Sequence, residues 1–248
     1  MKILYLDFFL GMETKMLLGA LLSLGADKEE IEKHLGAVFN NAQILCEDVK
    51  RCGVEALKAD IVFESDKSLE YEKALEYIEN INDDAAIMYL KRIFKAYFEA
   101  DKGALIKEKD ICILYALHLA IKDIDADYVI SSSLKEGSGF YEKDGGYFII
   151  PSYAVLEIFK TQKIPVRTVQ LEEELTNALS AAVLSQTANE FGTMPKINIE
   201  KIGYGAGDMD LKMPNLLRIV LGNVGIGEIE KMFASEDLFA EISEELFV

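Results

Sequence analysis

Apolar and polar residues recur along this chain with two periods, one typical of strands and one typical of amphipathic helices. In the first half, Gly25 and Asp27 lie where one helix is expected to end and the next to begin. The elements predicted from these patterns are a strand over 3–9, helices over 12–24 and 27–35, the second closed by Gly36, hairpin strands over 42–50 and 54–64, and helices over 68–79, 83–100 and 111–121. This half is therefore expected to mix strands with helices.

The second half carries the same two periods but more turn residues. Its predicted elements are a strand over 128–132, a hairpin turning at 144–146 into 147–150, a helix over 151–160, a strand over 166–171, helices over 172–190 and 228–246, and two strands flanking a glycine run near 203–207. Irregular alternation with at least two hairpins favours an α+β fold with a mixed β-sheet and packed helices. We expect one region over 1–248, divisible into subdomains 1–125 and 126–222 and a C-terminal helix over 228–246.

The glycine run is the first candidate for a binding site. Gly203, Gly205 and Gly207 alternate between two strand patterns, and glycine tolerates the backbone conformations that turn several N–H groups toward one anion. A plain tight hairpin loop is the alternative. Residues 131–139 form a second loop rich in hydroxyls and glycines, in which Ser138 and Gly139 are the candidate anion contacts.

Three further polar residues complete the predicted site. Arg218 interrupts an apolar strand, so its guanidinium is expected to reach an anion, a carboxylate or solvent. Asn215 precedes that strand, and Asp7 lies at the end of the first strand as the candidate catalytic residue, with hydrogen bonds to the following turn as the alternative. The glycine run, Ser138, Gly139 and Arg218 are predicted to line the main polar pocket.

Composition removes several classes of function. The chain of 248 residues is 50% apolar, enough for a full core, and its net charge of −17 opposes binding to nucleic acid. Residues near the start do not resemble a signal peptide, and no apolar run approaches the roughly 20 residues that span a bilayer. Three cysteines without a C-x-x-C pair favour a reducing cytoplasm and a soluble protein with no membrane partner.

Several motifs also resemble one known family in order and spacing. They are the opening KILYLDFFLGMETKMLLGALLSLGAD, the segments SSSLKEGSGF, IIPSYAVLEIFK, PVR and NEFGTMP, and the final GYGAG, PN and LRIVLG. Together they are similar to the N-terminal domain of the LarC family of nickel-insertion proteins. The resemblance implies CTP-dependent insertion of nickel into a pyridinium bisthiocarboxylate mononucleotide, a cyclometallase reaction of the lyase class, with the nucleotide handled by a separate C-terminal domain.

The chain departs from that family at positions that bear on chemistry. Lys15 replaces an aspartate of the first turn, Gly145 stands where a histidine is common, and residues 101–108 lack a His-aromatic-His-Glu motif. Residues 177–180 replace a Thr-Pro-Thr-Gly motif and are predicted to be plain helix. We therefore expect a divergent, shortened member with no metal site of its own, since the two histidines and three cysteines are dispersed.

Two functions remain open from the sequence. One is a nickel-insertion subunit that works with a separately encoded C-terminal domain; nickel and CTP are then implied by the resemblance alone. The other is a non-catalytic paralogue that binds a nucleotide-like small molecule or a protein. Phe233, Phe239 and Phe247 in the predicted C-terminal helix favour contact with a partner chain, either a second copy or the missing domain.

Overall fold

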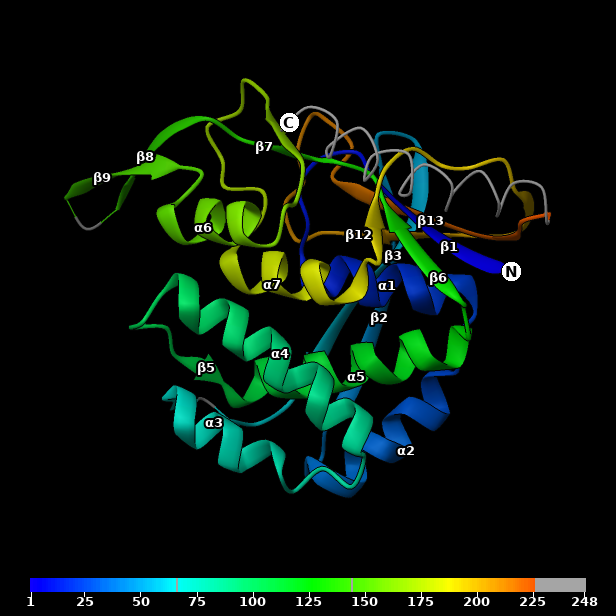
Figure 1. Cartoon of the computed structure of the whole chain (residues 1–248), viewed down its shortest axis with the longest axis horizontal. Helices are drawn as coiled ribbons and strands as arrows, with labels where there is room; N and C mark the ends of the chain where they lie inside the picture. Colours follow the sequence, from blue (N-terminus) through cyan, green and yellow to red (C-terminus); the bar gives the residue numbers. More distant parts are fainter. Residues whose placement is uncertain (66, 144, 226–248) are drawn as a thin grey trace, which may run out of the picture.

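A seven-stranded mixed sheet forms the centre of the protein in its computed structural model, which describes residues 1–65, 67–143 and 145–225 (Figure 1). In spatial order its strands are β11 (Glu190–Phe191), β6 (Tyr128–Ser131), β1 (Lys2–Phe8), β13 (Leu216–Asn223), β12 (Asn198–Ala206), β3 (Val54–Val62) and β2 (Gln43–Arg51). Neighbours β11, β6 and β1 run parallel, β1, β13 and β12 run antiparallel, β12 and β3 run parallel, and β3 and β2 form an antiparallel hairpin. The predicted α+β fold with a mixed sheet is confirmed.

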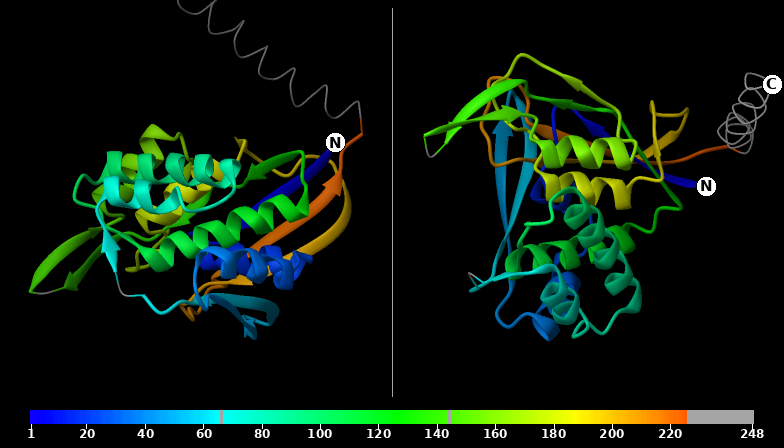
Figure 2. Two further views of the ribbon diagram at one scale, coloured as in Figure 1. Left: turned by 90° about the horizontal axis from the view of Figure 1, so that it is seen from below. Right: turned by 60° about the vertical axis from the view of Figure 1, so that its left-hand side comes forward.

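Seven helices accompany the sheet in the described residues. They are α1 (Thr14–Leu24), α2 (Lys28–Val38), α3 (Tyr71–Ile78), α4 (Asp84–Ala100), α5 (Glu108–Ile124), α6 (Tyr153–Thr161) and α7 (Ala178–Thr187). Helix α1 packs directly on β12, β3 and β13, while α4 packs against α5, α6 and α7 farther from the sheet. Figures 1 and 2 show these helices gathered on one side of the sheet. One face of the sheet therefore carries most of the core.

Helix ends follow the capping chemistry expected from the sequence. Gly25 ends α1 in the left-handed conformation, and its N–H donates to the carbonyls of the last turn. The side chain of Asp27 accepts a hydrogen bond from the Glu30 N–H at the start of α2, and Asp83 caps α4 in the same way. These side chains fix where the chain enters each helix.

Three two-stranded sheets lie outside the main one. They pair β4 (Ser68–Leu69) with β5 (Ile106–Lys107), β7 (Leu134–Glu136) with β10 (Val166–Thr168), and β8 (Gly139–Lys143) with β9 (Gly146–Ile150). The β8–β9 hairpin projects from the body of the molecule in all three views of Figures 1 and 2. The predicted hairpins at 42–64 and around 144–146 are thus both present.

The two faces of β1 show how the alternation of side chains divides the core. Leu4, Leu6 and Phe8 point into the large cluster shared with the helices. Ile3 and Tyr5 join a smaller cluster on the opposite face. A polar residue at an odd-numbered position of β1 is therefore expected on the face opposite the helices, and one at an even-numbered position on the helix side.

The prediction of a glycine loop is wrong for Gly203 and Gly205. Both lie inside β12, and no positive φ is found at either residue. A Cβ on Gly205 would lie 1.9 Å from the Met16 carbonyl oxygen, and one on Gly203 would lie 2.5 Å from the Ala20 carbonyl oxygen. The glycines are required because the backbone of α1 lies directly against the strand, not because the chain turns there.

Several helix boundaries also differ from the prediction, and α5 (Glu108–Ile124) is longer at both ends than the predicted 111–121. Helix α2 continues past Gly36 to Val38, and α3 begins at Tyr71 because Ser68 and Leu69 pair with β5. Helix α7 begins at Ala178, six residues later than predicted, because residues 172–177 form an extended segment that is tied to β7 and to the turn after β1.

The domain division stays a prediction, although the central sheet takes strands from both proposed subdomains, 1–125 and 126–222. The predicted C-terminal helix over 228–246 and its three phenylalanines lie outside the described residues. In the residues that are described, no helix combines the length and apolar character needed to cross a bilayer.

Replacing Gly205 with alanine should lower the free energy of unfolding by about 3 kcal/mol or more, because backbone atoms of α1 must move away from the strand. The matched control is Gly36→Ala on the exposed face of α2, where an added Cβ meets no atom within 4 Å. That variant should gain about 0.5 to 1 kcal/mol. Urea denaturation measures both, and equal stability of the two variants would refute the close-contact explanation.

Candidate functional site

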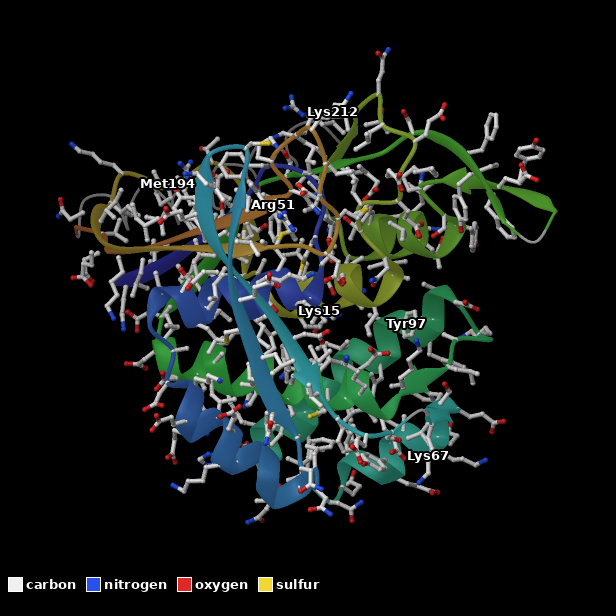
Figure 3. All side chains as sticks on the ribbon, turned by 180° about the vertical axis from the view of Figure 1, so that it is seen from behind. Lys15, Arg51, Lys67, Tyr97, Met194 and Lys212 are labelled. Carbon is white, nitrogen blue, oxygen red and sulfur yellow. The ribbon has the colours of Figure 1, made fainter. Side chains whose placement is uncertain are left out.

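A pocket of about 130 Å³ lies where the N-termini of α1 and α7 meet, beside the start of α5. Its polar lining comes from four segments of the chain: Glu13, Thr14 and Lys15 at α1, Asn177 and Ser180 at α7, Asp110 on α5, and Asp208 after β12. Figure 3 shows Lys15 near the middle of the molecule, beside the long β2–β3 hairpin. Residues far apart in sequence thus meet at one polar depression.

Hydrogen bonds between the two helix starts hold the pocket wall together. The Ser180 hydroxyl accepts a hydrogen bond from the Thr14 N–H at 3.1 Å and lies 3.0 Å from the Thr14 hydroxyl. Asn177 caps α7 by accepting from the Ser180 N–H at 2.8 Å. Thr176 accepts from the Met12 N–H at 3.0 Å. Both positive helix ends are therefore fixed toward the same space.

The extended segment before α7 is anchored by a buried carboxylate. Glu136 on β7 is fully buried and accepts hydrogen bonds from the Leu175 N–H at 2.5 Å and the Gly137 N–H at 3.0 Å. Burial raises the pKa of Glu136 against the opposing effect of these donors. Glu136 thereby positions Leu175 and the adjacent Thr176, which lead into the start of α7.

Five side chains of alternating charge run along the edge of the pocket, and we call them the lysine–aspartate chain. In order they are Lys109, Asp60, Lys15, Asp208 and Lys58, with successive nitrogen–oxygen distances of 3.1, 2.9, 3.2 and 2.9 Å. Isolated exposed ion pairs contribute little, but a connected network holds each member in place more firmly. Three ammonium groups alternate with two carboxylates in this chain, and Glu13 and Asp110 add two carboxyl groups to the same pocket.

The pKa values follow from this arrangement. Burial alone would lower the pKa of Lys15, but hydrogen bonds and charge from Asp60 and Asp208 outweigh it and raise that pKa. Burial likewise opposes the lysine contacts at Asp60 and Asp208, and the contacts lower the pKa of both carboxyls. Asp110 differs, because burial outweighs its neighbouring lysines and raises its pKa. Lys15, Asp60 and Asp208 are therefore charged near neutral pH.

Glu13 ties the segment between β12 and β13 to the start of α1. Its carboxylate accepts hydrogen bonds from the Asp208 N–H at 2.9 Å and from the Asn215 amide at 3.1 Å. A Cβ on Gly207 would lie 2.1 Å from this carboxylate, so a larger residue would displace the Glu13 side chain. Asn215, predicted to bind a ligand, is buried, and its amide group holds this segment through Glu13 and the Met209 carbonyl.

The predicted grouping of Arg218 with the pocket is wrong. Arg218 pairs with Asp7 across β13 and β1, with its Nε 3.0 Å from Asp7 Oδ2. Asp7 follows Ile3 and Tyr5 at every second position, which places it on the sheet face opposite the helices. Of the three partners expected for Arg218, an anion, a carboxylate or solvent, the structure shows a carboxylate, and the pair lies on the other side of the sheet from the pocket.

Ser138 and Gly139 also lie away from the pocket. The Ser138 hydroxyl donates to the Val169 carbonyl at 2.8 Å, and its N–H donates to the Leu171 carbonyl at 2.9 Å. Gly139 adopts a φ of 116° at the start of β8 and lies beside Glu172. Their polar groups join backbone segments, which corrects the prediction that they line the main pocket with the glycine run.

Residues 177–180, expected to be plain helix, instead form the helix N-terminus at the pocket. Asn177 is the N-cap of α7, and its side chain accepts a hydrogen bond from the Ser180 N–H. An asparagine is a typical helix start, but the prediction began the helix at residue 172 and so did not use this signal. Sequence reasoning also missed Glu13, Asp110 and the lysine–aspartate chain. Scattered acidic and basic residues carry no local signal, because only the fold brings them together.

No group of three or more His, Cys, Asp or Glu that could hold a metal ion is found in the described ranges 1–65, 67–143 and 145–225. His34 is exposed on α2, and its Nδ1 lies 2.9 Å from the Glu30 carbonyl. His118 is largely buried near Asp83, and burial lowers its pKa. Cys46, Cys52 and Cys112 are all free thiols.

Comparison with known proteins identifies the family. A family model described as nickel insertion protein matches residues 4–243. This chain belongs to that family. The expected membership is thus confirmed over nearly the whole chain, including the segments that form the pocket.

Relatives in the family are longer than the region that matches. A pyridinium-3,5-bisthiocarboxylic acid mononucleotide nickel insertion protein of Thermotoga petrophila is 31% identical over 99% of this chain and 67% of its own length. A protein of the same name from Clostridium kluyveri is 29% identical over 100% of this chain and 69% of its own. A putative nickel insertion protein of Dictyoglomus thermophilum is 31% identical over 90% and 61%. No solved structure matches the chain.

The half-buried carboxyl of Asp110 predicts a pH-dependent difference in stability. The pKa of Asp110 is raised in the folded state. The wild-type protein therefore loses stability as pH rises from the pKa of the unfolded state, about 3.9, through the pKa of the folded state, because the folded protein must then give up a proton that it binds more tightly. The free energy of unfolding of Asp110→Asn minus that of the wild type should therefore increase between about pH 3 and pH 7. Denaturation at several pH values measures it, with exposed Asp48→Asn as the matched control. A difference that stays constant or falls would contradict the assignment.

Proposed function

We propose that this chain takes part in inserting nickel into pyridinium-3,5-bisthiocarboxylic acid mononucleotide, and that the pocket at α1 and α7 holds the anionic end of that substrate. The observation that carries this is the meeting of two helix N-termini with Lys15. Helix N-termini and an ammonium group are common partners of phosphate. Membership of the family and the names of its relatives supply the substrate class.

The size of the pocket limits what it can enclose. About 130 Å³ is well below the roughly 300–1,000 Å³ of pockets that enclose a whole drug-sized ligand. One end of a mononucleotide fits, and the remainder would extend beyond the pocket. A second protein surface is then needed to cover the pyridinium ring and its thiocarboxylates.

The longer relatives suggest where that surface comes from. This chain corresponds to 67% of the Thermotoga relative and 61% of the Dictyoglomus relative. A domain equivalent to the remainder of these relatives would supply that surface and, by resemblance to the LarC family, bind CTP for a cyclometallase of the lyase class. Nickel is the metal substrate in this scheme. The free thiols of Cys46 and Cys52, both exposed, are consistent with the reducing cytoplasm as the site of the reaction.

A non-catalytic paralogue that binds a nucleotide-like ligand or a protein is the second candidate. The dispersal of His34, His118 and the three cysteines in the described residues favours it, because nickel prefers imidazole or thiolate ligands. Both functions use the anion pocket. They differ in whether nickel is inserted into the bound ligand.

Titration calorimetry with nicotinic acid mononucleotide, a pyridinium carboxylate with a phosphate monoester, tests the pocket. Replacing Lys15 with alanine should weaken binding by roughly 10- to 100-fold, as expected for one charge-assisted contact. Lys33→Ala on the exposed face of α2 removes the same charge away from the pocket and should leave affinity unchanged. Equal affinities for both variants and the wild type would refute the assignment of the pocket.

Titration with nickel separates a metal-binding role from a substrate-binding role. The isolated chain should show no tight stoichiometric nickel binding, because no group of three or more His, Cys, Asp or Glu in the described residues could hold a metal ion. Tight binding that survives His34→Ala but is lost in His118→Ala would overturn this prediction. It would place a metal function on the buried side of α5.

A further inference from the structure

Asp208 lies between two lysines in the position that an anionic ligand would take. Its Oδ1 is 2.9 Å from Lys58 Nζ, and its Oδ2 is 3.2 Å from Lys15 Nζ. Each carboxylate oxygen therefore contacts a different ammonium group. A phosphate monoester has three terminal oxygens and carries up to two negative charges, so it can make the same two contacts with a greater electrostatic attraction.

Two features make the Asp208 carboxylate displaceable. Its side chain is 48% exposed, and ion pairs at such exposure are individually weak. Its backbone is held separately, because the Asp208 N–H donates to both oxygens of Glu13. The carboxylate can therefore leave the lysines by rotation of the side chain, while the segment from Gly207 to Asn215 stays anchored.

Asp60 differs from Asp208 in both respects. Its Oδ2 contacts Lys15, while its Oδ1 contacts Lys109 at 3.1 Å and accepts a hydrogen bond from the Ile61 N–H at 2.7 Å. It also lies within strand β3, which pairs with β2 on one side. Asp60 is therefore a fixed partner that keeps Lys15 oriented, and Asp208 is the partner that a ligand can replace.

We propose that Asp208 is an internal competitor of the substrate, and that a phosphate monoester displaces its carboxylate and binds jointly to Lys15 and Lys58. The inference rests on the proposed function and deepens it. It names a dianionic phosphate monoester as the group recognised and adds Lys58, on the neighbouring strand β3, as the second contact. Small monoanions then bind poorly, because they must displace Asp208 with no gain in charge.

Calorimetric titration with ribose 5-phosphate tests the competition at constant ionic strength. Asp208→Asn removes the competing charge and should tighten binding roughly tenfold. Asp210→Asn is the matched control: it removes the same charge from the same segment, but Asp210 faces Arg51 at 3.5 Å. This control should change affinity by no more than about twofold, through screened long-range charge alone.

The role of Lys58 provides an independent arm. Adding Lys58→Ala to Asp208→Asn should abolish the gain in ribose 5-phosphate affinity. Acetate should bind measurably neither to the Asp208→Asn variant nor to the double variant. Thermal melting of each variant checks that the fold is kept.

The outcomes separate the two proposals. Wild-type binding that depends on Lys15, combined with equal affinity in Asp208→Asn and Asp210→Asn, would overturn the competition and leave the pocket assignment standing. A gain in Asp208→Asn that survives loss of Lys58 would overturn the joint contact. Absence of ribose 5-phosphate binding in every protein would overturn both the competition and the pocket.

Discussion

The direct contact between the backbone of α1 and the glycines of β12 is the constraint on which the rest of the structure depends. Gly203 and Gly205 leave room for the Ala20 and Met16 carbonyls at distances that no larger residue permits. Because this contact fixes α1 against the centre of the sheet, it also fixes where the helix begins. The start of α1 carries Glu13, Thr14 and Lys15, so a packing requirement in the core determines the geometry of the pocket.

The remaining parts of the pocket are attached to that fixed point by polar contacts. Ser180 joins the start of α7 to Thr14, and buried Glu136 holds the segment that leads into α7. On the other side, Glu13 gathers Asp208 and Asn215. The positive end of each helix and the lysines would be costly to place together without acidic partners. The alternating charges stabilise this arrangement of the pocket, and they also create the competition that a ligand must overcome.

The sequence predicted the elements well where local chemistry specifies them. Gly25 and Asp27 mark helix ends through capping, and the alternation in β3 identifies a strand because Ala59 and Ile61 are buried on one face.

It failed at the candidate site, where the determining contacts are between distant segments. Alternating glycines are compatible with a loop or with close packing against a helix, and nothing local distinguishes them. Lys15 lies at the start of α1 and Arg218 lies within β13, and only the alternation along β1 and β13 reveals that Arg218 points to the sheet face opposite the helices. Asn177 was hidden inside an apolar period that continued through the extended segment before α7.

The central claim is that the pocket at α1 and α7 receives the phosphate of a pyridinium mononucleotide. A crystal structure of the protein with nicotinic acid mononucleotide tests it most directly. We expect the phosphate within hydrogen-bonding distance of Lys15 and Lys58, with the Asp208 carboxylate rotated away and the ring outside the pocket. A phosphate ordered instead against Arg218 on the opposite face of the sheet, with Asp208 still bridging both lysines, would contradict it.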